Sequence, residues 1–403
     1  MTRHFKYALA CCLLSGSLRA QIPTPIVPAG VGVNIHFVRG HEKDLDLIAA
    51  CGFKFVRMDF SWEETEPKAG EYDWAAYEEL SEHLARHGLR AIYILDYVNA
   101  AYEPMVESRR AVGEAVPERH LASPRHPESV AAFARWAAAA ARHFRERSVI
   151  WEIYNEPNGG FWRPKPDVAE YTALALATGK AVREAESGAI IIAPAMSGFD
   201  WNFLEPFLRS GVLQYLDGVS VHPYRRPDQP PETAAADYTR LRELIDRFAP
   251  EAKRNRIPIL SGEWGYSSNR KGVSLSTQAQ YAVRQQLSNL FNGVPLSIWY
   301  DWKNDGTDRD DNEQNFGVTD ADLRPKPAYN ALLQMTRELD GFQLKERLGE
   351  FDKKDFVLLF ARPDGAQKVV AWSLAGTHAV RLTRWQPEVS LELGPLPQYV
   401  SVK

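Results

Sequence analysis

The stretch Trp151-Glu152-Ile153-Tyr154-Asn155-Glu156-Pro157-Asn158 is a short run of strand-forming residues that ends in an amide, a carboxylate and a proline. Aromatic and β-branched residues favour a strand, and a proline cannot continue a central one. A second stretch, Ile257-Pro258-Ile259-Leu260-Ser261-Gly262-Glu263-Trp264-Gly265, has the same arrangement of an apolar run followed by a carboxylate. Each stretch therefore predicts a buried strand that carries a glutamate at its carboxyl end.

The surrounding sequence alternates short strand-like runs with helical segments of period near 3.6. The predicted strands are 31–37, 54–60, 90–97, 149–155, 189–195, 218–224, 256–263 and 294–301. The predicted helices lie near 42–51, 74–87, 128–145, 168–185, 202–210, 233–248, 277–291 and 327–340. Eight repeats predict an α/β fold, a closed parallel (β/α)8 TIM barrel, over residues 28–342. A doubly wound open sheet is the alternative, but no Gly-rich dinucleotide turn follows any strand.

The pattern changes at the C-terminal end of the chain, over residues 343–403. Short alternating runs at 356–361, 367–372, 379–382, 389–393 and 399–402 are separated by Pro, Gly and Asp. This pattern is typical of antiparallel strands. We therefore expect a small C-terminal antiparallel β domain, like a sandwich, and a strand at 22–27 is a candidate to join it.

Composition limits the class of protein. The chain has 403 residues, of which 45% are hydrophobic and 25% charged, as in ordinary globular proteins. Its formal net charge of -4 offers no basic excess for neutralising phosphates. A general nucleic-acid binder is therefore excluded, and a neutral or weakly charged partner fits better.

The first 20 residues have the composition of a targeting segment. Arg3 and Lys6 precede a mostly apolar run, and small residues follow up to Ala20. This pattern predicts a secretory signal peptide, too short to span a bilayer, and a secreted or periplasmic protein. A lipoprotein attached through Cys11 or Cys12 is the less favoured alternative. Removal of residues 1–20 would leave a single cysteine and no internal disulfide.

Polar side chains gather where the predicted strands end, which is where a parallel barrel carries its active site. They are Asn34, His36, Arg57, Asp59, Asp96, Asn155, Glu156, His222, Tyr224, Glu263 and residues 299–301. Nearly every strand thus ends in a hydrogen-bonding group suited to a polyol. Two carboxylates on separate strands are also what retaining glycoside hydrolysis requires.

Several of these motifs, taken in order, resemble the clan A glycoside hydrolases. They are Val56-Arg57-Met58-Asp59, Asn155-Glu156-Pro157, His222-Pro223-Tyr224 and Ser261-Gly262-Glu263-Trp264-Gly265. Within the clan the chain is most similar to family 39, the group of PslG-type exopolysaccharide endoglycosidases and β-xylosidases, through Gly32-Val33-Asn34-Ile35-His36-Phe37 and Tyr300-Asp301-Trp302. The resemblance covers roughly residues 30–340. It implies that Glu156 is the acid/base, Glu263 the nucleophile and Asn155 a contact to the sugar 2-hydroxyl.

The chemistry of glycoside cleavage agrees with these roles. The departing oxygen needs a proton, so the donor must stay protonated near neutrality. We expect the negative charge of Glu263 to raise the pKa of Glu156, while Arg57 and the Tyr224 hydroxyl keep Glu263 ionised. The carboxyl separation expected for a retaining enzyme is about 5 to 5.5 Å.

Each of these residues also has a structural alternative. Either glutamate alone could be a surface carboxylate after a strand. Arg57 could be an ion-pair partner of Asp59, and His222 an interior histidine with satisfied nitrogens. The occurrence of both glutamate motifs in order, together with Arg57 and His222, favours the catalytic interpretation.

Tryptophans follow many predicted strand ends, at positions 62, 162, 201, 264, 299 and 302. Sugar rings pack on aromatic faces, although a single tryptophan is more often part of the core. We expect about half of the six to face the substrate. Trp162, Trp264 and Trp299 are the predicted substrate contacts, with Trp299 at the floor of the site.

Two acidic segments need separate interpretation. Glu66 and Glu71, in the loop after the second strand, are interpreted as structural. The run 305–313 lacks the spacing of a twelve-residue calcium loop, so a hydrogen-bonded loop is favoured over a calcium site. No His/Cys cluster has zinc spacing, and Glu152 with Glu156 lacks the histidines of a zinc protease. The prediction includes no metal and no cofactor.

The sequence therefore predicts a secreted retaining glycoside hydrolase that cleaves a β-linked polysaccharide or oligosaccharide by double displacement. The insertion 99–127, with Arg109, Arg110, Glu118 and Arg119, is expected to form one wall of the groove and makes an endo-acting or a charged-substrate role possible. An exo-acting β-xylosidase and an endo-glucanase or mannanase are alternatives. A non-catalytic carbohydrate-binding barrel is the alternative of another class. The sugar, the linkage and the oligomeric state stay open.

Overall fold

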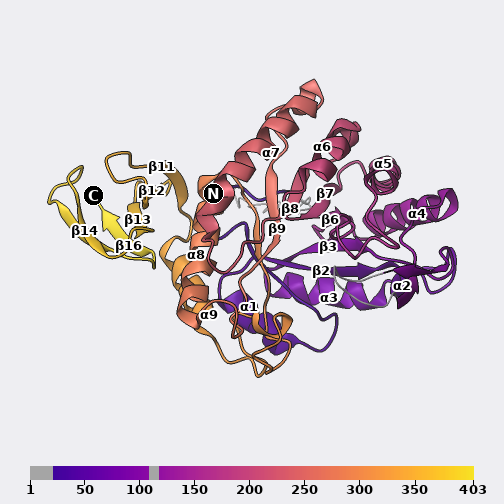
Figure 1. The fold of residues 1–403 in the computed structure, drawn as a ribbon, viewed down its shortest axis with the longest axis horizontal. Coiled ribbons are helices and arrows are strands. Elements are labelled where there is room, and N and C mark those ends of the chain that lie inside the picture. The colour runs from indigo at the N-terminus through magenta and orange to yellow at the C-terminus, as the bar shows by residue number, and fades with distance from the viewer. Residues whose placement is uncertain (1–20, 109–117) are drawn as a thin grey trace, which may run out of the picture.

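The computed structural model describes residues 21–108 and 118–403, and its larger part is a closed barrel of parallel strands (Figure 1). The barrel strands are β1 (Val31–Asn34), β2 (Phe55–Ser61), β3 (Arg90–Asp96), β6 (Ile150–Ile153), β7 (Ile190–Ser197), β8 (Gly218–His222), β9 (Ile259–Trp264) and β10 (Ser297–Trp299). They close in the order β1-β10-β9-β8-β7-β6-β3-β2. The predicted (β/α)8 barrel is confirmed.

Helices follow the barrel strands along the chain and cover the outside of the barrel (Figure 1). They are α1 (Glu42–Ala50), α2 (Trp62–Thr65), α3 (Ala75–Arg86), α4 (Pro127–His143), α5 (Val168–Ala185), α6 (Trp201–Arg209), α7 (Ala235–Phe248), α8 (Leu275–Phe291) and α9 (Pro327–Glu338). Local sequence defines their starts: Pro127 occupies the first turn of α4, and Asp167 accepts the N–H groups of Ala169 and Glu170 to cap α5.

Side-chain alternation along the strands divides the barrel interior into layers. The lower part is an apolar plug of Phe55, Ile92, Ile150, Ile192, Leu260, Leu296 and Ile298. One step further along β2 and β6 the inward positions carry Arg57 and Glu152, both buried. Successive inward residues are two apart in a strand, so the apolar plug and the charged layer are adjacent. The charged layer lies directly beneath the carboxyl ends of the strands.

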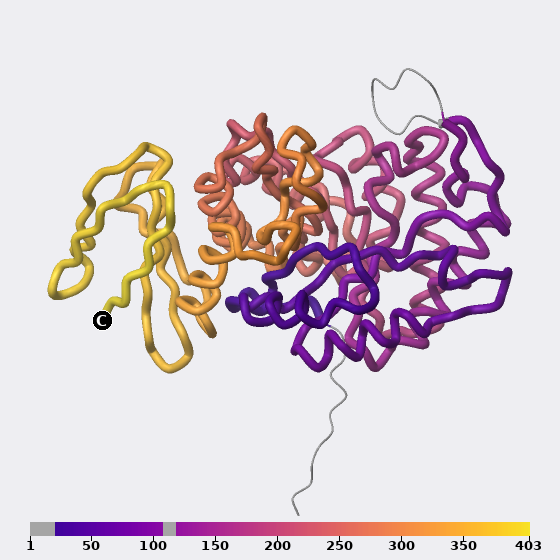
Figure 2. The backbone as a smooth tube through the Cα atoms, turned by 90° about the horizontal axis from the view of Figure 1, so that it is seen from below, coloured from indigo at the N-terminus to yellow at the C-terminus, as the bar shows by residue number. Residues whose placement is uncertain are grey.

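The C-terminal strands form a separate lobe at one end of the molecule (Figure 2). One sheet has the order β11 (Gln343–Arg347), β12 (Asp355–Ala361), β13 (Gln367–Ser373) and β16 (Gln398–Val402), and β14 (His378–Leu382) pairs with β15 (Val389–Leu393). In β12 the residues Val357 and Leu359 belong to a core shared with β14 and β15, whereas Phe356 and Phe360 join the barrel core. The predicted small antiparallel C-terminal unit is confirmed.

The structure corrects some element predictions. Residues 22–27 form no strand, and only Ile26 makes an isolated bridge, to Gln343. Strand β11 was not predicted because its sequence is polar. The insertion contains an unpredicted hairpin of β4 (Met105–Ser108) and β5 (Glu118–Leu121). The predicted signal peptide and the pair Arg109 and Arg110 lie outside the described residues.

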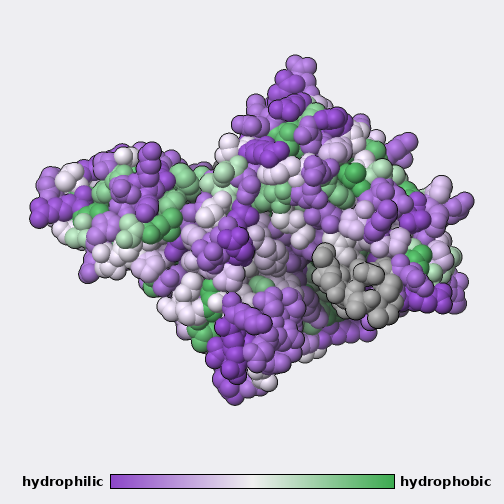
Figure 3. All heavy atoms as spheres, in the orientation of Figure 1, coloured by the Kyte–Doolittle hydropathy of each residue, from purple (hydrophilic) through white to green (hydrophobic). Residues whose placement is uncertain are grey.

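Hydrophilic side chains predominate on the face shown in Figure 3, and the hydrophobic ones form small separate patches. Among the described residues, no helix combines the length and apolarity needed to cross a bilayer.

A buried ion pair of the barrel is hydrogen-bonded to the C-terminal lobe. Glu232 accepts two hydrogen bonds from Arg284 of α8, at 2.8 and 2.7 Å, and a third from the Trp372 indole of β13, at 2.7 Å. Both charged side chains are at most 5% exposed. The Trp372 ring also stacks on Phe356 at 4.8 Å between ring centroids.

We predict that Glu232→Ala lowers the free energy of unfolding by about 3 to 5 kcal/mol, because Arg284 is left as a buried, unpaired charge. Denaturant unfolding of the purified protein measures the change. Glu338→Ala is the matched control, since Glu338 pairs with Lys368 across the same two units at a more exposed site and should cost at most about 1 kcal/mol. Equal losses in the two variants would contradict the prediction.

Candidate active site

An unusual backbone conformation presents Glu156 at the carboxyl end of β6. Tyr154 has φ 65° and Glu156 has φ 45°, both in the left-handed region that non-glycine residues seldom adopt. The Glu156 N–H donates to the Ala195 carbonyl at 3.0 Å, which ties this turn to β7. Strained backbone of this kind persists only where surrounding contacts hold it, and it is often found at functional sites. The turn directs the Glu156 carboxyl toward His222 of β8.

A bulge at the end of β9 orients Glu263. Ser261 pairs with Ser297 and Trp264 with Trp299, so β9 has one more residue than β10 between these pairs. Such an extra residue redirects the side chains that follow it. Gly262 lies in the bulge, where a Cβ atom would come within 2.3 Å of Ser220 Oγ. Only glycine fits this position, and it lets Glu263 approach the centre of the barrel.

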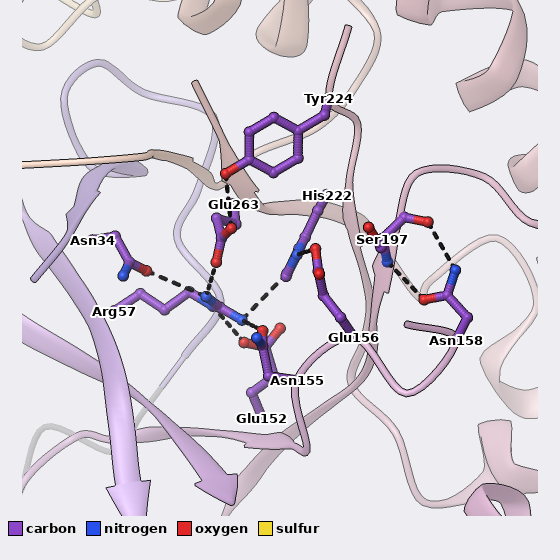
Figure 4. Close-up of polar contacts among 10 residues, drawn as sticks. All are labelled: Asn34, Arg57, Glu152, Asn155, Glu156, Asn158, Ser197, His222, Tyr224 and Glu263. Carbon is purple, nitrogen blue, oxygen red and sulfur yellow. Dashed lines mark hydrogen bonds and ion pairs between the residues drawn. The ribbon is translucent and has the colours of Figure 1, made fainter. Parts of the chain in front are cut away.

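The buried Arg57 guanidinium occupies the centre of the site (Figure 4). Its Nε donates to Glu152 at 2.6 Å, and its Nη1 donates to Glu263 at 2.7 Å and to Asn34 at 3.2 Å. Its Nη2 donates to Asn155 Oδ1 at 2.7 Å. The Asn155 oxygen is thereby occupied, so its amide NH2 group is the part left to contact a ligand.

The two predicted catalytic carboxylates lie together above Arg57. Tyr224 donates its hydroxyl to Glu263 Oε1 at 2.8 Å, while Arg57 holds Oε2, so both oxygens of Glu263 are hydrogen-bonded. One oxygen of Glu263, one oxygen of Glu156 and a nitrogen of His222 lie within 4.8 Å of one another. Both glutamates therefore face the same small volume (Figure 4).

Hydrogen bonding determines the tautomer of His222 and argues against a metal here. Arg57 Nη2 can only donate, so His222 Nε2 accepts across 3.2 Å. Nδ1 then carries the hydrogen and donates to Glu156 Oε1 at 2.9 Å. Glu156, His222 and Glu263 have metal-like spacing, but a metal ligand needs a free imidazole lone pair. Both nitrogens of His222 are already occupied.

The free protein keeps Glu156 more acidic than the sequence led us to expect. Burial acts to raise its pKa, but hydrogen bonds from His222 and Ser197 and the charge of Arg57 outweigh burial, and the pKa lies below its usual value. The expectation of a raised pKa is therefore wrong for the unliganded state. The donors to the ionised carboxyl, which sequence reasoning had not included, explain the difference.

Comparison with known proteins identifies the family. The family model for cellulase, glycosyl hydrolase family 5, matches residues 27–306. The chain belongs to this family. It is an O-glycosyl hydrolase, and the predicted membership of clan A is confirmed. A search of curated protein sequences finds no match.

Solved structures with a similar fold include several glycoside hydrolases. A family 39 enzyme from Bacteroides cellulosilyticus WH2 has 24% identity and a TM-score of 0.77, over 93% of this chain and 81% of that one. A family 39 β-xylosidase from Caulobacter crescentus has 20% identity and a TM-score of 0.63, over 91% and 82%. An endo-β-1,6-glucanase has 13% identity and a TM-score of 0.64, over 94% and 91%. At these identities the likeness is one of fold.

Most polar residues predicted for the site of this family 5 hydrolase lie at the carboxyl ends of the strands. Asn34, Arg57, Asn155, His222 and Tyr224 form a connected hydrogen-bond network with both glutamates. Arg57 forms no ion pair with Asp59, so the structural alternative for Arg57 is not observed among the described residues.

His36, Asp59 and Asp96 lie outside this network. His36 is partly exposed, and its Nε2 lies 3.6 Å from Asp301. Burial raises the pKa of Asp301 to about 7, although the charge of the nearby His36 opposes this shift. Asp59 is exposed at the end of β2, and Asp96 is buried at the end of β3.

The tryptophan predictions for this hydrolase need correction. Trp162, Trp264 and Trp299 are all 0% exposed, so their rings offer no face to a sugar. The alternation of side chains along β10 explains the burial of Trp299. Ile298 belongs to the plug inside the barrel, so its neighbour Trp299 points outward, where its ring is inclined by 30° to that of Tyr266 at 6.5 Å between centroids. Of the remaining three, Trp62 and Trp302 are also buried, and Trp201 is partly exposed.

Sequence reasoning missed several contributors to the site. Glu152 is the buried partner of Arg57, and the only sequence signal was a charge inside the apolar run of β6. Ser197 hydrogen-bonds Glu156 and is held by Asn158 through bonds of 3.0 and 2.9 Å. The partly exposed Tyr300 takes the place expected for Trp299, with its ring 5.6 Å from His36 and 6.5 Å from Tyr224.

The two acidic segments make internal contacts. Glu66 is buried and accepts hydrogen bonds from Trp62, Gly70 and Tyr102. In the run 305–313, Asp308 and Asp311 are linked through Gln314 and Asn315. These contacts agree with structural roles for both segments.

We predict that His222→Phe raises the pKa of Glu156, because the principal hydrogen bond to the ionised carboxyl is lost while burial remains. Carbon-13 NMR titration of glutamate-labelled protein measures the value, with Glu156→Gln used to assign the signal. Ser197→Ala should shift the pKa in the same direction by a smaller amount. An unchanged or lower pKa in His222→Phe would refute the assigned hydrogen bond.

Proposed function

We propose that this protein is a secreted retaining glycoside hydrolase that cleaves β-linked polysaccharides or oligosaccharides by double displacement. The observation that supports it most directly is the proximity of Glu156 and Glu263, whose oxygens lie within 4.8 Å. Retaining enzymes place their carboxyls about 5 to 5.5 Å apart, whereas inverting enzymes need about 6.5 to 9.5 Å to admit a water. Secretion rests on the composition of residues 1–20.

In the first step Glu263 attacks the anomeric carbon and the bond to the glycosidic oxygen breaks. Arg57 and Tyr224 hold the two Glu263 oxygens, which supports an ionised and oriented nucleophile. Glu156 gives its proton to the departing oxygen. His222 occupies Oε1 of Glu156, so the proton is carried by Oε2. The Asn155 NH2 group faces the sugar hydroxyl next to the reacting carbon.

The pKa of Glu156 changes during this cycle. A bound sugar displaces water from the carboxyl, which favours the protonated acid despite the hydrogen bond from His222. Formation of the glycosyl ester removes the negative charge of Glu263, so ionised Glu156 is then favoured. In the second step Glu156 takes a proton from the water that attacks the ester, and free Glu263 is restored.

We predict that Glu156→Gln and Glu263→Gln each greatly reduce turnover of a natural glycan. Loss of general acid catalysis alone should cost about 10²- to 10⁴-fold in kcat. Glu71→Gln is the matched control, because the exposed pair with Lys68 is the only ion pair that Glu71 forms among the described residues. Near-normal rates in either site variant would remove that residue from its role.

We further predict that the first product released retains the β configuration. Proton NMR of the reducing end during the first minutes of hydrolysis distinguishes the anomers. A 2-deoxy-2-fluoro glycoside with an activated leaving group should label Glu263, detected by mass spectrometry of peptides. Initial release of the α anomer would show inversion and exclude the covalent route.

Endo action is the finer part of the proposal, and it rests on the insertion at 99–127, of which β4 and β5 form a hairpin. We predict that products of mixed length appear early during digestion of a polysaccharide substrate. Size-exclusion chromatography of the digest reveals them. Exclusive release of monosaccharides from the chain end would instead favour the exo-acting β-xylosidase alternative.

A further inference from the structure

Asp59 and Asp96 form a second carboxyl pair at the strand ends, apart from Glu156 and Glu263. Asp59 is two residues beyond Arg57 on β2, about 7 Å along the strand, and faces the same side. The neighbouring strand β3 ends at Asp96. Asp59 is exposed and Asp96 is only 1% exposed, so the pair reaches from the surface of the cleft into the protein.

Besides burial, Asp59 acts on the pKa of Asp96 through a hydrogen bond between the two carboxyls as well as through its charge. Ionised carboxylates only accept hydrogen bonds, so this contact requires a shared proton. Burial, and then the charge of Asp59, raise the pKa of Asp96 well above its usual value. No N–H or O–H donor of the described residues reaches the buried Oδ2 of Asp96. The pair therefore holds one negative charge and a buried oxygen without a donor.

Among the described residues, carboxylates outnumber cations on this side of the cleft, where burial opposes protonation of His36 but Asp301, Asp305 and Asp59 outweigh burial and raise its pKa. In the part of the chain that the structure describes, Asp59, Asp305 and Glu313 form no ion pair within 4 Å. Burial, and then the charges of Glu263 and Asp305, raise the pKa of Glu313. The charge of Arg57 is already shared by Glu152 and Glu263. Carboxylates in excess over cations create a negative potential that concentrates positively charged ligands.

We propose that Asp59 and Asp96 bind a protonated amino group, so that the substrate is a β-glycan with unacetylated amino sugar units. This inference rests on the proposed function and names its substrate class. An ammonium group has three N–H donors, which match the Asp59 carboxylate and the donor-free oxygen of Asp96. On binding, the shared proton stays between the two carboxyls, and the ammonium neutralises the remaining negative charge while it donates to Asp59 and to the free oxygen of Asp96.

Other sugar substituents match the pair less well. A carboxylate sugar is repelled by the same charges. An N-acetyl group has no positive charge and a single N–H donor, and a hydroxyl group supplies one donor to a pair that already shares a proton. Of these substituents, only the ammonium both neutralises the negative charge of the pair and donates a hydrogen bond to the free oxygen of Asp96.

Binding of three disaccharides that share one ring and one linkage tests the inference. They are β-1,4-linked glucosamine dimer, its di-N-acetylated form and cellobiose, titrated by calorimetry at pH 6 into Glu263→Gln protein to prevent hydrolysis. We expect the amino dimer to bind at least about tenfold more tightly than either neutral sugar, as charged hydrogen bonds are stronger. Asp59→Asn and Asp96→Asn should remove this preference.

Asp322→Asn is the matched control, since Asp322 forms an exposed pair with Arg324 away from the site, and it should keep the preference. Equal affinity for the three sugars, or a preference that survives Asp59→Asn and Asp96→Asn, overturns the inference. Hydrolysis of a neutral aryl β-glycoside by wild-type protein tests the catalytic proposal separately. Binding preference without hydrolysis would sink the catalytic proposal and leave this inference standing.

Discussion

The site depends on one buried cation, Arg57, all of whose N–H groups donate hydrogen bonds. Arg57 has five N–H donors, and five acceptors from other parts of the barrel receive them: Glu152, Asn34, Glu263, Asn155 and His222. A buried guanidinium is costly unless it is paired and fully hydrogen-bonded. Here the pairing also orients the groups around the cation, because the same bonds that satisfy it hold the Glu263 carboxyl, the amide of Asn155 and the tautomer of His222.

Much of this arrangement was predictable because it follows from periodicity and chemical type. Eight apolar runs alternating with amphipathic helices define a closed barrel, and a parallel barrel places every strand end on one face. The polar residues that follow those runs must then gather, however distant they are in sequence. This reasoning predicts that Arg57, His222 and Tyr224 lie near Glu156 and Glu263, as the structure shows.

Periodicity does not predict which side of a strand faces the barrel interior, nor the backbone conformation of the last residues of each strand. A shift of one residue exchanges inside and outside, which is why Trp299 lies in the outer core and Tyr300 faces the site. The bulge at Gly262 and the left-handed backbone at Glu156 depend on contacts with neighbouring strands. Ser197, the last residue of β7, is held through its backbone N–H and carbonyl by the side chain of Asn158. These features are tertiary and have no local sequence signal.

Because all five N–H donors of Arg57 already have acceptors in the protein, this guanidinium has none left for a ligand. A substrate that enters the cleft meets no free positive charge from this residue, because Glu152 and Glu263 already neutralise it. The charges that remain available to the ligand are mainly carboxylates, with Asp59 on one side and Glu313 near Glu263. The network that holds both oxygens of Glu263 thus also leaves the other carboxylates of the cleft without the charge of Arg57. Under the proposed function, the same electrostatics that orient Glu263 disfavour acidic glycans, without any dedicated repulsive element.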